Sequence, residues 1–124
     1  MGSRKSARSV LVIEDDPGLR SLLGMVLLRD GWIVEAAANG EAAIASLERA
    51  LPNVVLLDLN MPVLDGWDVL ARRASEPTWS RIPVIVMSAE HHCAEAVLEF
   101  GATAFLPKPF SVDDLRQVLQ QLLG

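Results

Sequence analysis

The chain has 124 residues, of which 51% are apolar and 22% charged, a composition that excludes a disordered polymer and fits one globular domain. Its formal net charge is −5 and it has no basic run beyond Arg4, Lys5 and Arg8, so we expect no direct binding of nucleic acid. The single cysteine excludes an intramolecular disulfide, and no apolar run approaches the roughly 20 residues that span a bilayer. We therefore expect a cytoplasmic protein without membrane contact, with a flexible tail over residues 1–8 and one domain over residues 9–124.

Strand-like and helix-like segments alternate five times along the chain. Strands are expected over residues 9–13, 32–37, 54–58, 83–88 and 104–106. Helices are expected from Pro17 until Gly31 ends the first, over residues 41–49, 67–75 and 91–100, and after Ser111. Asp16 suits the N-cap position before Pro17, and Ser111 with Asp114 has the spacing of a capping box.

This alternation predicts how the elements are connected in space. Helices that separate successive strands indicate right-handed crossovers between parallel strands. The all-apolar run over residues 54–57 is typical of a strand that is buried on both faces. The predicted fold class is therefore α/β, a (βα)5 doubly wound parallel sheet with helices on both sides.

Acidic residues follow two of the predicted strands. Glu14, Asp15 and Asp16 come after the first strand, and Asp58 ends the third. If these strands are neighbours, the carboxylates meet at one edge of the sheet and repel, so either some are protonated or a cation neutralises them. Mg²⁺ suits such a site because it accepts carboxylate oxygens and keeps waters. Capping of the first helix explains Asp16, but it does not need three acids in a row.

Two other strand ends carry groups that complement the acids. Ser88 ends the fourth strand and offers a hydroxyl that can bond a phosphoryl oxygen, and Lys108 follows the fifth strand with a positive charge. Each is ambiguous alone, because such a serine is often a turn residue and such a lysine is often solvated. Together with a carboxylate nucleophile and metal-binding acids, they indicate phosphoryl transfer onto Asp58.

With these motifs in place, nearly the whole chain resembles the receiver domain of two-component response regulators, in particular single-domain chemotaxis receivers. The matching segments are residues 10–16, 57–62, 65–66, 86–89 and 108–110. The resemblance implies a flavodoxin-like sheet with strand order 2-1-3-4-5. It also implies a phosphorelay partner, either a histidine kinase or a phosphotransfer protein.

The resemblance assigns roles to the acidic site. Asp58 would be the phosphoacceptor, and Asp15 and Asp58 would bind Mg²⁺ together with the backbone carbonyl of Asn60. Glu14 takes the place of a more common Asp, so its contact with the metal is either direct or through a bound water.

The resemblance also assigns the groups around the phosphoryl oxygens. Ser88, in place of a more common Thr, and Lys108 would bind these oxygens, and the Lys108–Pro109 peptide would be cis. Phe105 takes the place of a switch aromatic that is often Tyr, and plain core packing is its alternative role.

The implied function is a phosphorylation-dependent signalling switch. The domain would catalyse its own aspartyl phosphorylation and dephosphorylation rather than act as a conventional enzyme. It would relay the signal through the surface formed by the fourth helix, fifth strand and fifth helix. Asn60 and Glu90 flank the expected path of the attacking water, so we expect them to speed the loss of phosphate, unless they are only solvated loop residues.

Three other functions compete with this interpretation. A receiver-like docking module that works without phosphorylation would keep the fold but usually lose part of the site. An aspartate-nucleophile phosphohydrolase needs a second acid two residues after the nucleophile, where this chain has Asn60. A flavin-binding carrier would need Ser, Thr and Gly after the first strand, where residues 14–16 are acidic.

The segment His91-His92-Cys93 also suggests a metal site. Three consecutive residues of a helix point in different directions, so we expect that they do not converge on one ion. The segment is instead interpreted as the exposed start of a helix.

Overall fold

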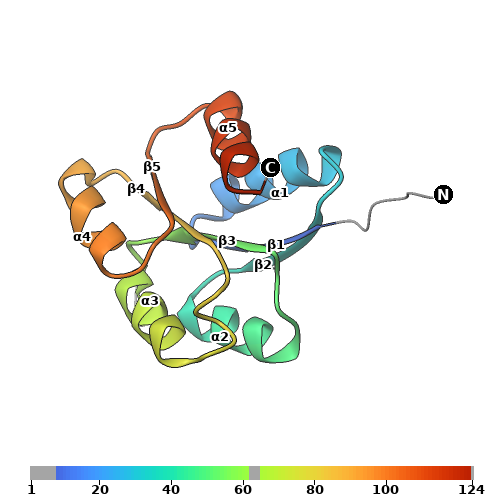
Figure 1. Ribbon diagram of the computed structural model, residues 1–124. Helices are drawn as coiled ribbons and strands as arrows, with labels where there is room; N and C mark the ends of the chain where they lie inside the picture. The colour runs from blue at the N-terminus through green and yellow to red at the C-terminus, as the bar shows by residue number, and fades with distance from the viewer. Residues whose placement is uncertain (1–7, 62–64, 124) are drawn as a thin grey trace.

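The computed structural model describes residues 8–61 and 65–123 and contains one five-stranded, all-parallel sheet (Figure 1). The strands are β1 (Ser9–Ile13), β2 (Ile33–Ala37), β3 (Val54–Asp58), β4 (Val84–Ser88) and β5 (Ala104–Pro107). Their order is β2-β1-β3-β4-β5, which confirms the predicted doubly wound fold. Residues 1–7 of the predicted tail and Pro62 of the third-strand motif lie outside the described residues.

Among the described residues, five α-helices connect and follow the strands. They are α1 (Pro17–Arg29), α2 (Gly40–Arg49), α3 (Gly66–Ser75), α4 (Ala94–Glu99) and α5 (Val112–Leu123). Asp16 caps α1 by accepting a hydrogen bond from the Leu19 amide, and Ser111 and Asp114 form the predicted reciprocal bonds at α5. Within the described part of the chain, none of the helices is long and apolar enough to cross a bilayer.

The fourth helix differs from its prediction. Residues 91–100 were expected to form one helix, but the segment begins as a 3₁₀ turn, η1 (His91–Cys93), and only then becomes α4. Neither η1 nor α4 has a side-chain cap. No capping side chain therefore favours an α-helix that begins at His91.

Two apolar layers hold the helices on the sheet, and they follow the alternation of side chains along the strands. Val10, Val12, Leu56 and Ile85 face α1 and α5, where Leu27 belongs to the same cluster. Alternate residues of the same strands face α2, α3 and α4. These strand residues include Leu11, Ile13, Leu57 and Val86, and they share a cluster with Leu47 of α2, Leu70 of α3 and Val97 of α4. Figure 1 shows α1 and α5 on one side of the sheet and the other helices on the opposite side.

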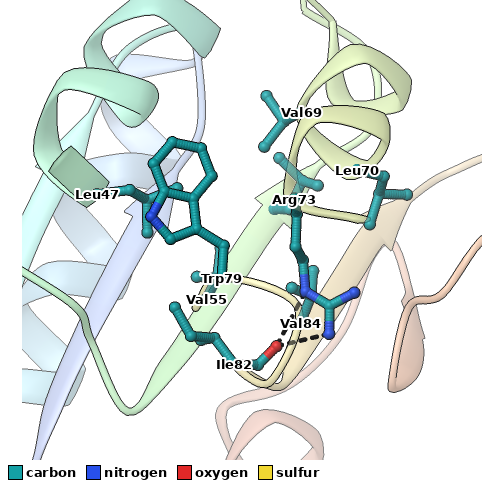
Figure 2. Close-up of a pocket in the computed structure, with 9 residues that line it drawn as sticks. Leu47, Val55, Val69, Leu70, Arg73, Trp79, Ile82 and Val84 are labelled. Carbon is teal, nitrogen blue, oxygen red and sulfur yellow. Dashed lines mark hydrogen bonds between the residues drawn. The ribbon is translucent and has the colours of Figure 1, made fainter. Parts of the chain in front are cut away.

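An arginine fastens α3 to the amino end of β4. The Arg73 guanidinium donates to the carbonyl of Ile82 at 2.7 and 3.0 Å, to that of Ser80 at 3.0 Å and to that of Gly101 at 3.0 Å. Figure 2 shows its bonds to Ile82 beside the indole of Trp79, which is 6% exposed. The hollow between these residues measures about 10 Å³, room for one water at most, so it is a packing defect and no ligand site.

Candidate active site

The carboxyl ends of β1 and β3 bring two buried acids together. The Glu14 amide continues the β1 ladder by donating to the Ala37 carbonyl at 3.0 Å, which fixes the residue immediately after the strand. Asp58 is the last residue of β3 and pairs with Met87 of β4. Glu14 is 1% and Asp58 3% exposed, so both carboxyl groups are almost removed from solvent.

Lys108 connects the two acids. Its Nζ lies 3.0 Å from Glu14 Oε1 and 3.3 Å from Asp58 Oδ1. The backbone amide of Lys108 donates to the Ser88 carbonyl at 2.9 Å, and the peptide to Pro109 is cis as predicted. Burial alone would lower the pKa of Lys108, but its bond to Glu14 and the charge of Asp58 outweigh burial and raise it. The ammonium group is therefore charged at neutral pH.

One lysine does not balance the acids around Asp58. Burial, the neighbouring Asp15 carboxyl and the charge of Glu14 raise the pKa of Asp58 from 3.8 to about 7, although Lys108 opposes the shift. A further cation next to Asp58 would oppose this shift and favour its charged form. The site is short of positive charge, as the sequence predicted.

The donor set suits a hard cation. One carboxylate oxygen from each of Glu14, Asp15 and Asp58 lies within 4.8 Å of the others, and Asp15 is exposed to solvent. Three oxygen donors with one open side match the preference of Mg²⁺ for carboxylates and water. Both Glu14 oxygens already have partners, since Oε1 accepts from Lys108 and Oε2 from the Asp16 amide at 3.1 Å.

The structure also places the remaining predicted residues. Ser88 is fully buried, and its Oγ accepts a hydrogen bond from the Glu90 amide at 3.0 Å. The Asn60 amide donates to Asp58 Oδ1 at 3.3 Å, while the residue as a whole is exposed, like Glu90. Phe105 is half-buried and packs against the core on the α3 and α4 side.

Two supporting residues did not emerge from the sequence reasoning. The Arg20 guanidinium donates to the Glu14 carbonyl at 2.8 Å and so braces the acidic loop from α1. A Cβ at Gly66 would lie 2.7 Å from the Asp58 carbonyl oxygen and from the Leu59 Cα. Only glycine therefore allows α3 to begin this close to the backbone of the third strand. The Asp65-Gly66 pair was a visible signal for Gly66, whereas nothing in the spacing pointed to Arg20.

A doubly wound parallel sheet with an acidic pocket, a buried aspartate and a lysine at its carboxyl edge defines a class of phosphorylatable signalling domains. Residues 10–120 match the model of the response regulator receiver domain family. The chain belongs to this family of two-component signalling domains, which confirms the resemblance seen in its sequence.

Individual relatives agree with the family. The chain is 34% identical to the transcriptional regulatory protein TrcR of Mycobacterium tuberculosis over 116 residues, 92% of this chain and 44% of that protein. It thus spans about half the length of the curated relatives it matches first. The chemotaxis response regulator CheY4 of Vibrio cholerae has a similar structure, with a TM-score of 0.89 and 28% identity over 95% of this chain and all of that one.

A second similar structure holds a metal. The receiver domain of the sensor histidine kinase PA1611 from Pseudomonas aeruginosa was solved with a magnesium ion coordinated in its active site cleft. It is 28% identical, with a TM-score of 0.85 over 94% of this chain and 97% of that one.

Proposed function

We propose that this domain accepts a phosphoryl group on Asp58 from the phosphohistidine of a histidine kinase or phosphotransfer protein and acts as a signalling switch. The observation that carries the proposal is the buried Asp58 carboxyl within 3.3 Å of the Lys108 ammonium and beside two further acids. In the transfer, an Asp58 oxygen attacks phosphorus while the bond from phosphorus to the histidine nitrogen breaks. The electron pair of that bond returns to the imidazole.

Mg²⁺ fits the acidic pocket as the cofactor. Asp15 and Asp58 would hold it through carboxylate oxygens, with the Asn60 carbonyl as a third ligand. Because both Glu14 oxygens are engaged by Lys108 and the Asp16 amide, we assign Glu14 to the indirect role through metal-bound water. When bound, the ion supplies positive charge that keeps Asp58 ionised and stabilises the phosphoryl oxygens.

Two residues of this chain would hold the phosphoryl group. Lys108 can exchange its contact with Asp58 for a phosphoryl oxygen while it keeps its bond to Glu14. The Ser88 hydroxyl accepts from the Glu90 amide, so its own proton can be donated to a phosphoryl oxygen. Movement of Ser88 toward that oxygen would remove the acceptor of the Glu90 amide and loosen the turn that leads into α4.

That movement suggests the route of the signal. Phe105 pairs with Val86, two residues before Ser88, and is only half-buried. Its ring would therefore become more buried if movement of Ser88 frees space for it to turn inward. The helix α4, which borders β5, exposes the apolar side chain of Leu98. We propose the α4-β5-α5 surface as the one that partners read. In a Ser88→Ala variant, phosphorylation should still occur, but NMR shifts at residue 105 should no longer respond to it.

The lifetime of the acyl phosphate would depend on two exposed residues. Asn60 and Glu90 flank Asp58 and Ser88, and their polar side chains can orient an attacking water. We therefore expect relatively rapid self-dephosphorylation. Phosphate release should slow in a doubly substituted Asn60→Ala, Glu90→Ala protein, and unchanged kinetics would show that both are ordinary loop residues.

The acceptor assignment is tested with a small phosphodonor. The protein is incubated with Mg²⁺ and the donor, and the gain of one phosphoryl mass is followed by intact-protein mass spectrometry. Asp58→Asn should show no gain, whereas Asp113→Asn, at a side chain that is 95% exposed, should behave like the parent. Equal labelling of Asp58→Asn would refute the assignment. If the folded parent is not labelled even by a partner kinase, a phosphorylation-independent docking module is the better description.

A further inference from the structure

A second group of metal-ligating side chains lies on the turn that precedes α4. One ligand atom each from Glu90, His92 and Cys93 lies within 4.8 Å of the other two. We propose that these three residues form a site for a borderline transition-metal ion, Zn²⁺ in the first place, separate from the acidic pocket at Asp58. The proposal concerns binding and does not depend on phosphorylation of the domain.

The shape of the turn explains why Glu90 and Cys93, two of the three residues, converge. In a 3₁₀ helix, side chains three residues apart lie above one another, which brings Cys93 over Glu90. The Cys93 amide donates to the Glu90 carbonyl at 3.0 Å and closes this turn. The sequence argument assumed an α-helix and treated His91, His92 and Cys93 as the group, so it missed Glu90 as the third partner.

The backbone of the turn is held in place on both sides of the site. The Glu90 amide is bonded to Ser88 Oγ at 3.0 Å, and the His91 ring nitrogen Nε2 lies 3.3 Å from the Lys108 carbonyl oxygen. The His91 ring thus has a partner outside the cluster, and His91 provides a matched control. Cys93 is half-buried against the core, whereas Glu90 and His92 are exposed, so an ion can enter from solvent.

The chemistry of the donors selects the kind of ion. A thiolate, an imidazole nitrogen and a carboxylate oxygen are the three ligand types that Zn²⁺ takes, and Mg²⁺ does not favour the first two. On binding, the Cys93 thiol loses one proton to solvent and its sulfur forms the metal bond. Thiolate and Glu90 carboxylate then balance the two positive charges, and the fourth tetrahedral position is left for water.

Cobalt titration tests the site with a signal that the acidic pocket cannot give. Reduced protein that is free of transition metals is kept in excess Mg²⁺, which is added to occupy the acidic pocket. It is titrated with Co²⁺, and the near-ultraviolet charge-transfer band of a thiolate–cobalt bond is recorded. We expect the band to saturate at one equivalent and to disappear when Zn²⁺ is added. No phosphodonor is present, so failure of the phosphoacceptor assignment would leave this result unaffected.

Variants at the exposed positions decide whether all three residues bind. His92→Ala and Glu90→Gln should each weaken Co²⁺ binding by about tenfold or more, since even indirect partners of metal ligands cost that much. His91→Ala should keep the affinity of the parent. Near-ultraviolet circular dichroism of the metal-free variants checks that the fold is retained. Absence of the band in the parent, or an affinity unchanged by His92→Ala and Glu90→Gln, would overturn the proposal.

Discussion

The two ends of the sheet hold charged side chains that are removed from solvent, wholly or in part, in opposite ways. At the amino end of β4, the Arg73 guanidinium donates four hydrogen bonds to three neutral backbone carbonyls. At the carboxyl end, Glu14 and Asp58 share the single ammonium group of Lys108. Burial lowers the pKa of Arg73 from its usual value, but the carbonyls surround it with partners. The pKa of Asp58 is instead raised to about 7.

This difference separates a residue that supports the fold, Arg73, from a site that can carry out chemistry, Asp58 and its neighbours. A half-buried cation that makes four hydrogen bonds to backbone carbonyls fixes the chain in place and offers no reactive group. Two buried carboxyls with one cation form a site that gains stability when further positive charge arrives. We therefore expect substitutions at the Arg73 end to lower stability without changing phosphorylation, and those at the Asp58 end to change phosphorylation.

The largest effect is expected at Lys108. Lys108→Met removes the positive charge next to Asp58, and the rate of labelling by a small phosphodonor should fall by about 10²–10³-fold, as for other removed transition-state contacts. Lys108→Arg keeps the positive charge but places it on a larger, planar group, so its labelling rate should lie between those of the parent and Lys108→Met. Initial rates from intact-protein mass spectrometry measure both, and a rate for Lys108→Met within about threefold of the parent would contradict the role.

Arg73→Ala should instead lower stability. The variant leaves the Ile82, Ser80 and Gly101 carbonyls without their donor, which we expect to cost about 2–4 kcal/mol of the free energy of unfolding. Denaturant titration measures the loss, and the labelling rate per folded molecule should stay at the parent value. A large fall in that rate would mean that the two ends of the sheet are coupled, against the comparison made above.

Asp58→Asn should stabilise the metal-free protein, and only at higher pH. Because the pKa is raised in the folded state, the charged carboxyl opposes folding as pH rises from about 4 to about 7. At pH 8 the free energy of unfolding of the variant should therefore exceed that of the parent by about 1–3 kcal/mol. Near pH 4 the two free energies should be nearly equal. Denaturant titration in chelator at both pH values measures this. A difference in stability between variant and parent that does not change with pH would contradict the raised pKa of Asp58. Added Mg²⁺ should reduce this difference at pH 8.

The smallest effect is expected for a charged pair away from both ends. Arg116 on α5 bonds both carboxylate oxygens of Asp30 at 2.8 and 3.0 Å, but the pair is open to solvent. Arg116→Ala should lower the melting temperature by at most about 3 °C, and high salt should remove the effect. A larger fall in melting temperature that does not depend on salt would mean that the Arg116–Asp30 pair stabilises the fold as strongly as Arg73 does.

The sequence predicted the strand ends better than the contacts that support them. The acids, Ser88 and Lys108 were found because each follows an apolar run, and parallel strands must end at a common edge. The bracing by Arg20 and the bonds of Arg73 could not be predicted, because they join side chains to distant backbone carbonyls that no periodicity marks. The turn at residues 91–93 was mistaken for α-helix, since the two forms differ by a single hydrogen-bond step.

Borohydride trapping tests the central claim most directly. Reduction of an aspartyl phosphate converts that residue to homoserine, which peptide mass spectrometry can locate in the chain. After incubation with Mg²⁺ and a phosphodonor, the account predicts homoserine at position 58 and at no other acidic residue. Reduction at Asp15 or Glu14, or labelled protein without any homoserine, would contradict the assignment of Asp58 as the phosphoacceptor.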